Sequence, residues 1–260
     1  MEVVVLESAA AVAHLVTDAV CALLRRRPDA VLGLATGSST SAVYDELVDR
    51  FRRREVSFER AQGLLLDEYV GLPAGHPQRY DAVIRRTFTS HVDLAPGALQ
   101  GLDGGAVDSE AECRRYERAI AAAGGINLQL LGIGRDGHLG FNEPGSSLGS
   151  RTRLKTLTAA TRDDNARFFA PGESVPKHVL TQGLATIGEA RHLVLVASGE
   201  VKADAVAAAV EGPLTASCPA SVLQLHPHAT VALDEAAASR LRRLGYYRQT
   251  FADKPSWQDI

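Results

Sequence analysis

The chain has 260 residues, of which 45% are hydrophobic and 23% are charged, and its formal net charge at pH 7 is -3. This composition is typical of a globular protein, and the lack of excess cations argues against nucleic acid as a partner. No apolar run approaches the roughly 20 residues that span a bilayer, and no basic flank precedes an apolar N-terminal core, so we expect a cytoplasmic protein with no membrane contact.

Short apolar runs alternate with stretches of helical periodicity, which is typical of βαβ units. Apolar residues recur on one face of a predicted helix at Ala9–Arg26, and Pro28 ends it. A second helix is expected at Ala111–Ala123, before two glycines. Residues 73–77 and 95–105 are rich in Gly and Pro and are predicted loops. Strands are predicted at Val3–Leu6, Ala30–Leu34, Gly63–Leu66, Ile126–Leu131, His192–Ala197 and Thr230–Leu233.

No internal repeat or linker divides this pattern, so residues 1–260 are predicted to form a single domain. Polar and charged residues dilute the apolar pattern between residues 145 and 176. We expect a mobile lid segment there.

The loop after the strand that ends at Leu131 concentrates reactive side chains. Four glycines between residues 132 and 140 exclude an ordinary helix, and Asp136, His138 and Glu143 fall within eight positions. Carboxylates beside an imidazole fix its tautomer and stabilise its protonated form. These three residues are therefore candidates for a proton-transfer unit, and the alternative is a structural histidine in a turn.

Metal binding and serine hydrolysis are weaker interpretations of the same loop. The loop has one imidazole, the chain has no HExxH or HxH spacing, and its three cysteines are scattered. The chain also lacks the GxSxG elbow of serine hydrolases. We expect no metal and no redox cofactor.

Asp67 directly follows the predicted strand Gly63–Leu66, where an acid often faces the ligand crevice of an α/β protein. Burial would raise its pKa toward working pH and make it a general base. Capping of the next turn is the alternative role.

Residues 36–40 (Thr-Gly-Ser-Ser-Thr) lie between a predicted strand and a helix N-terminus, where backbone N–H groups and the helix dipole attract anions. The alternative is a tight turn whose helix is capped by Ser39 or Thr40. Arg167 and Lys202 would suit a phosphate held at this turn, although solvated charges are the usual fate of such residues.

Several segments resemble the glucosamine-6-phosphate deaminase (isomerase) family, in order from about residue 30 to 235. They are Leu66–Leu72, Gly134–His138, Phe141–Pro144, Ser150–Arg153, Val175–Lys177, Ala209–Gly212 and Leu223–Pro227. The resemblance implies a Rossmann-like three-layer α/β sandwich with a mostly parallel central sheet. It also implies conversion of glucosamine 6-phosphate and water into fructose 6-phosphate and ammonia, without a cofactor.

The resemblance assigns roles by position. Asp67 corresponds to the base that moves a proton between C1 and C2. His138 corresponds to the ring-opening acid/base, with Asp136 and Glu143 as its supporting carboxylates. The residues that correspond to the family's phosphate site are Gly37, Ser38, Ser39, Arg167 and Lys202.

Regulation is where the chain departs from the family. In allosteric members N-acetylglucosamine 6-phosphate binds at a subunit interface, and Ser146, Arg153 and Lys155 occupy the matching positions. The resemblance therefore allows this effector and a homo-oligomer. The tail from Gly245 to Ile260 differs from the allosteric pattern.

Two alternative functions remain open from the sequence. The related 6-phosphogluconolactonases share the loop around His138 but generally lack the Phe-Asn-Glu-Pro continuation found here at residues 141–144. A non-catalytic regulator that responds to sugar phosphates would keep the phosphate site. However, all four residues matched to catalysis are intact, and no helix-turn-helix segment is appended.

Overall fold

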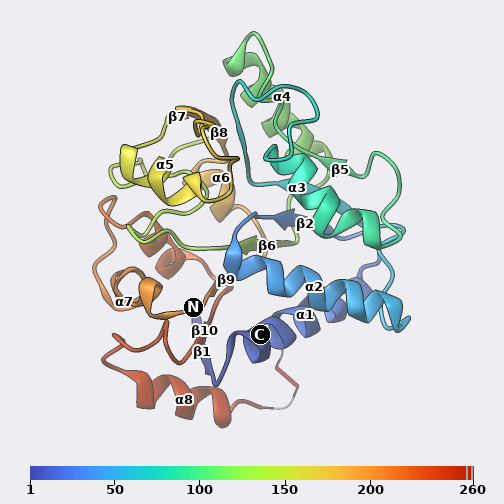
Figure 1. The fold of residues 1–260 in the computed structure, drawn as a ribbon. Coiled ribbons are helices and arrows are strands. Elements are labelled where there is room, and N and C mark those ends of the chain that lie inside the picture. The colour runs from blue at the N-terminus through green and yellow to red at the C-terminus, as the bar shows by residue number, and fades with distance from the viewer. Residues whose placement is uncertain (256, 259) are drawn as a thin grey trace.

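The fold has the predicted α/β architecture. The computed structural model describes residues 1–255, 257–258 and 260, and shows a parallel sheet with helices on both faces (Figure 1). The strands of this sheet are β1 (Glu2–Leu6), β2 (Val31–Leu34), β3 (Gln62–Leu65), β5 (Leu99–Gln100), β6 (Leu128–Leu131), β9 (Leu193–Ala197) and β10 (Ala229–Asp234). A smaller sheet contains β4 (Asp67–Tyr69), β7 (Arg153–Thr156) and β8 (His178–Thr181).

Helices of moderate length connect these strands. They are α1 (Ala9–Arg26), α2 (Ser38–Arg52), α3 (Tyr80–Thr87), α4 (Ser109–Ala122), α5 (Ala159–Ala166), α6 (Leu184–Gly188), α7 (Ala203–Glu211) and α8 (Leu244–Ala252). Side-chain caps begin three of them: Ser8 accepts the N–H of Ala11 at 3.1 Å for α1, Asp108 that of Ala111 at 2.9 Å for α4, and Thr158 that of Thr161 at 3.2 Å for α5.

The order of the central sheet places a ligand crevice near its middle. The strands run β1-β10-β9-β6-β2-β3-β5, and all neighbours are parallel. The chain moves from β2 to β3 on one side, and from β6 to β9 on the other. The order thus reverses between β2 and β6, and ligands of open α/β sheets bind outside the carboxyl ends of the strands at such a point.

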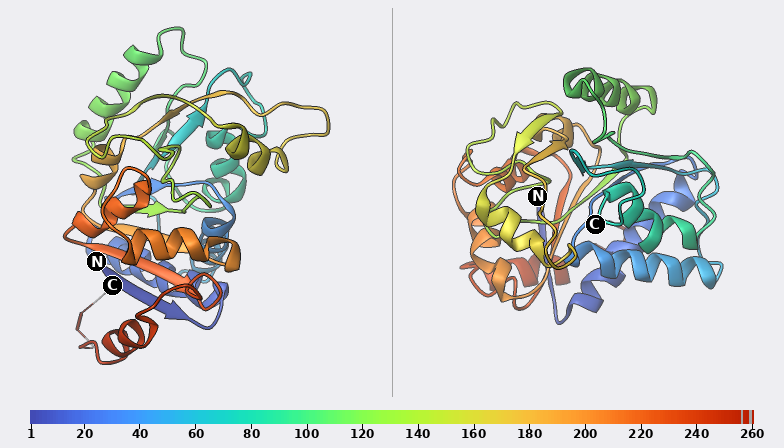
Figure 2. Two further views of the ribbon diagram at one scale, coloured as in Figure 1. Left: turned by 90° about the vertical axis from the view of Figure 1, so that its left-hand side faces the viewer. Right: turned by 45° about the horizontal axis from the view of Figure 1, so that its top comes forward.

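Two apolar layers hold the sheet between the helices. One layer includes residues of α1, α2 and α3 such as Val16, Leu47 and Ile84, and the other includes residues of α4 and α7 such as Tyr116 and Val206. Burial of these layers is the main stabilising contribution to the sandwich. Figure 2 (left) shows α4 at one edge of the molecule and α8 beyond β1 at the other.

Most of the central sheet follows the sequence prediction. The predicted helix at Ala9–Arg26 has the observed bounds, and the predicted strands begin and end within two residues of the observed ones. The prediction of a loop over residues 95–105 is wrong at Leu99–Gln100, which pair with Gly63–Leu64 as β5. Two residues are too few to display the alternation that identifies a strand.

The small sheet was not predicted. It is antiparallel, with Asp67 of β4 opposite Thr181 of β8 and Arg153 of β7 opposite the same threonine. Residues 145–176, expected to form a mobile lid, contain β7 and α5. The motion of this segment stays a prediction.

The described part of the tail packs against its own chain. Helix α8 contacts β1, and Lys254 Nζ lies 2.7 Å from Glu2 Oε2. Among the described residues, we find no helix with the length and apolar character needed to cross a membrane.

Candidate active site

The loop after β6 holds His138 against Asp136. The imidazole Nδ1 lies 2.6 Å from Asp136 Oδ1, and the backbone N–H of His138 donates to the same oxygen at 3.2 Å. Partial burial favours the protonated form of Asp136, but the hydrogen bond and charge of His138 outweigh it and lower the pKa of this carboxyl. A Cβ at Gly134 would lie 2.2 Å from the ring, so the imidazole can occupy this position only beside a glycine.

Asp67 lies at the start of β4 and is buried, with 5% of its surface exposed. Burial raises its pKa well above the ordinary aspartate value, and the neighbouring charge of Glu68 raises it further. A raised pKa suits a carboxylate to accept a proton from carbon near neutral pH.

The glycine at 140 brings the His138 loop close to Asp67. Its φ is +55°, and a Cβ there would lie 2.9 Å from Thr181 Oγ1 and 3.3 Å from Asp67 Oδ2. Thr181 also accepts the N–H of Phe141 at 3.2 Å. The loop that carries His138 therefore lies against Asp67, which is distant from it in the sequence.

Glu143 has different partners from those expected. Its carboxylate accepts hydrogen bonds from the N–H and hydroxyl of Thr158 and, at 2.5 Å, from the hydroxyl of Thr161. Among the described residues no hydrogen bond joins Glu143 to His138. Thr158 caps α5, so the buried Glu143 connects the His138 loop to that helix.

The cations expected at a phosphate site gather near the same loop. Lys202 Nζ donates to the carbonyl of Ile133 at 2.7 Å. Burial lowers the pKa of Lys202, and the charges of Arg167 and Arg135 lower it further. Arg167 itself is exposed, with its guanidinium 4.8 Å from the ring centre of Phe168.

The glycine–serine turn begins α2 at the carboxyl end of β2, the strand beside β6. Gly37 is the residue that precedes the helix, and no side chain caps the helix, so the predicted cap by Ser39 or Thr40 is wrong. The hydroxyl of Thr40 instead donates to the carbonyls of Ala35 and Gly37. Gly37 and Ser38 are exposed. The first N–H groups of α2 are therefore without a side-chain cap, as an anion site requires.

The residues matched to the effector site lie beside this centre. Ser146 is buried, and its hydroxyl has no hydrogen-bond partner in the described structure. The guanidinium of Arg153 donates to Asn142 Oδ1 at 2.8 Å. Lys155 follows two positions later on β7, on the same face of the strand.

Two parts of the site escaped sequence reasoning. Glu68 is buried directly after Asp67, and Tyr80 stacks on Phe141 with ring planes 9° apart and centres 6.0 Å apart. The proximity of Glu68 to Asp67 in sequence was the available signal. Tyr80 lies eleven residues after Tyr69, and only the fold brings the two rings to 5.0 Å.

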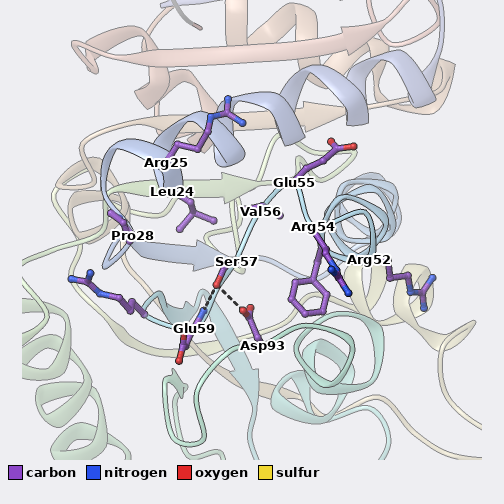
Figure 3. A pocket seen from close by; sticks show the side chains of 12 residues that line it. Leu24, Arg25, Pro28, Arg52, Arg54, Glu55, Val56, Ser57, Glu59 and Asp93 are labelled. Atoms are coloured by element: carbon purple, nitrogen blue, oxygen red, sulfur yellow. Dashed lines mark hydrogen bonds between the residues drawn. The ribbon is translucent and has the colours of Figure 1, made fainter.

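A cavity of about 680 Å³ lies away from this centre (Figure 3). It is lined by the end of α1, the segment after α2 and Asp93, and neither Asp67 nor His138 contributes to it. The described residues contain no group of three or more His, Cys, Asp or Glu side chains arranged to hold a metal ion.

The comparisons with known proteins agree with one another. A family model described as glucosamine-6-phosphate isomerases/6-phosphogluconolactonase matches residues 6–232. Glucosamine-6-phosphate deaminases of Mycolicibacterium smegmatis and Beutenbergia cavernae are each 60% identical over 261 residues, covering 100% of both chains. A solved monomeric glucosamine-6-phosphate deaminase is 40% identical, with a TM-score of 0.90 over 92% of this chain and 100% of that one. The 6-phosphogluconolactonase of Trypanosoma cruzi has a TM-score of 0.74 over 93% of this chain and 97% of its own, at 19% identity, which indicates a shared fold alone.

Proposed function

The chain belongs to the glucosamine-6-phosphate isomerase/6-phosphogluconolactonase family, and we propose that it acts as a glucosamine-6-phosphate deaminase. Its reaction converts glucosamine 6-phosphate and water into fructose 6-phosphate and ammonia. Identity of 60% over full length to curated deaminases supports this activity. The observation that carries the chemistry is the convergence of buried Asp67 with the Asp136–His138 pair across Gly140.

In the proposed mechanism His138 opens the sugar ring. It delivers a proton to the ring oxygen while the C1 hydroxyl proton is released, which gives the open-chain aldehyde. Asp136 orients the imidazole through Nδ1, so Nε2 is the nitrogen that meets the substrate. A positioned acid/base group of this kind contributes about 10²–10⁴-fold in rate.

Asp67 then performs the isomerisation. Its carboxylate takes the proton from C2 while the aldehyde oxygen O1 gains a proton, which gives an enolamine. It then returns its proton at C1 while the nitrogen loses one, which gives a ketimine at C2. Water adds at C2, the C–N bond breaks, and ammonia leaves. The buried position of Asp67 suits this role because the pKa of its carboxyl is raised toward that of a useful base.

The phosphate of the substrate is proposed to bind the uncapped N-terminus of α2 at Gly37, Ser38 and Ser39. Arg167 and Lys202 supply the positive charge. The position of Lys202 supports this, because the charge of Arg167 lowers its pKa and its Nζ lies 2.7 Å from the carbonyl of Ile133 at the start of the His138 loop.

The experiment that tests the activity is ammonia release from glucosamine 6-phosphate, measured beside hydrolysis of 6-phosphogluconolactone. We expect ammonia and fructose 6-phosphate in equal amounts. Lactone hydrolysis without ammonia release would overturn the assignment in favour of the other branch of the family.

The proposal also includes a binding site for a regulatory effector. Ser146, Arg153 and Lys155 are proposed to bind N-acetylglucosamine 6-phosphate, because Arg153 donates a hydrogen bond to Asn142, the residue before Glu143. Substrate saturation with and without this effector tests that site, and superimposable curves would reject it.

We also propose that the protein acts in the cytoplasm. Association of copies is a separate prediction, measured by light scattering.

A further inference from the structure

Glu68 is a buried carboxylate that collects backbone donors. It has no exposed surface, and its oxygens accept the N–H of Tyr69 at 2.8 Å, of Tyr80 at 3.0 Å and of Asp81 at 3.3 Å. Burial raises its pKa to about 7, although these three hydrogen bonds and Arg79 favour the ionised form. A group this costly to bury calls for a role beyond filling space.

The carboxylate takes the place of a helix cap. Arg79 precedes α3 and offers no side-chain cap, while Tyr80 and Asp81 are the first two residues of the helix. Their N–H groups, which have no partner within the helix, donate to the Glu68 carboxylate. The negative charge of this carboxylate also interacts favourably with the positive end of the helix dipole. Glu68 therefore joins the first residues of α3 to β4.

This anchoring determines where Tyr80 lies. Its ring stacks on Phe141 of the His138 loop and contacts the ring of Tyr69, and its hydroxyl interacts with the side chain of Thr36 beside the phosphate turn. The hydroxyl of Tyr69 in turn accepts the side-chain amide of Asn165 from α5 at 2.9 Å. Tyr80 thus contacts three segments around the proposed substrate site: β4 through Tyr69, the His138 loop through Phe141, and the phosphate turn through Thr36.

Glu68 also acts on Asp67 through its charge. Apart from burial, the charge of Glu68 is what raises the pKa of Asp67. The other ionisable side chains around the pair are those of Tyr44, Tyr69, Arg79, Tyr80 and Tyr116.

We propose that Glu68 is a positioning residue for the deaminase reaction: it anchors the start of α3 so that the ring of Tyr80 lies against Phe141, and it holds a carboxylate beside Asp67. This inference rests on the proposed function. Asp67 moves the proton, and Glu68 acts through it and through Tyr80 without touching the substrate.

The test is Glu68→Gln, which preserves volume but removes the charge and puts an NH₂ group among backbone donors. We expect kcat to fall about 10- to 100-fold, because misplacement of a site wall by about 1 Å has effects of this size. KM should change less, since Arg167 and Lys202 are untouched. The acid limb of the pH profile of kcat/KM should move to lower pH, because the charge of Glu68 no longer opposes ionisation of Asp67. The slope of that limb should correspond to the uptake of one proton, because Asp67 then titrates without a coupled neighbour.

Glu112→Gln is the matched control. Glu112 is also buried and accepts a backbone N–H, that of Asp103 at 2.7 Å, but it lies on α4. Its variant should lose stability and keep the parent pH profile. If Glu68→Gln also keeps the parent kcat and acid limb, the inference is overturned.

Glu68→Asp covers the case in which the amide variant does not fold. It keeps the charge and shortens the reach, so kcat should fall while the acid limb stays in place; a native kcat would contradict the anchoring role. Failure of both variants to fold would reduce Glu68 to a structural cap and overturn the inference.

Direct titration separates this inference from the proposed function. The ¹³C carboxyl signal of Asp67 should titrate at lower pH in Glu68→Gln than in the parent, and an unchanged titration would overturn the charge role. A parent chain that releases no ammonia would refute the proposed function alone, since the titration needs no turnover.

Discussion

Replacement of Gly134 by alanine tests whether the position of the His138 ring controls turnover. The new Cβ would lie 2.2 Å from the imidazole, and ordinary contact begins at 3.4 Å, so the ring must move by about 1.2 Å. That shift separates Nδ1 from Asp136 Oδ1, which are 2.6 Å apart. A displacement of about 1 Å at a reacting group costs about 10²-fold in rate, or about 2.7 kcal/mol of barrier.

Gly132→Ala is the control within the same loop. A Cβ at Gly132 meets nothing within 4 Å, and neither glycine has a positive φ, so both variants should fold. In the ammonia-release assay Gly134→Ala should lose about two orders of magnitude in kcat with little change in KM, while Gly132→Ala stays near the parent. Native turnover in Gly134→Ala, or an equal loss in both variants, would refute the reasoning.

Four further outcomes are expected. Asp67→Asn should fold with the parent's circular dichroism and lose about 10²–10⁴-fold in kcat, and full activity would exclude Asp67 as the base. In the parent, kcat/KM should fall on acidification at a pH above the ordinary aspartate range, because the raised pKa of Asp67 means its carboxylate is protonated sooner; a limb below pH 4 would contradict the burial effect. Arg167→Ala and Lys202→Ala should each raise KM for the sugar phosphate, since a charged group loses its partner, and unchanged saturation curves would count against the phosphate site. Thr161→Val should lower the free energy of unfolding by about 1–3 kcal/mol in urea titrations because a buried carboxylate loses a donor, whereas Thr161→Ser should lose less.

The central sheet was predictable because its strands are buried on both faces. Runs such as Leu193–Ala197 are wholly apolar and interrupted by helices of clear periodicity, which is the pattern of a parallel sheet. The small sheet was not predictable by the same means. Strand β7 alternates between exposed and half-buried residues, and β4 is three residues long and is separated from β3 by Leu66 alone.

In the candidate site, too, contacts between residues close in the sequence were predictable and contacts between distant segments were not. His138 and Asp136 are two residues apart, so their pairing followed from the sequence. Glu143 was assigned to the same pair by proximity in the chain, but its carboxylate turns to Thr158 and Thr161 instead. Hydrogen bonds across fifteen or more residues depend on how α5 docks, and no local pattern encodes that.

The two proposed acid/base groups come from different sheets. His138 belongs to a loop of the central sheet, whereas Asp67 belongs to β4 of the small sheet. The distance between the two groups is therefore set at the contact of Gly140 with Thr181, and not within either sheet. In the proposed mechanism His138 opens the ring and Asp67 moves the proton between C2 and C1, so the whole reaction needs both groups at one substrate. Changes confined to this contact should alter the isomerisation step while the central sheet and the Asp136–His138 pair remain intact.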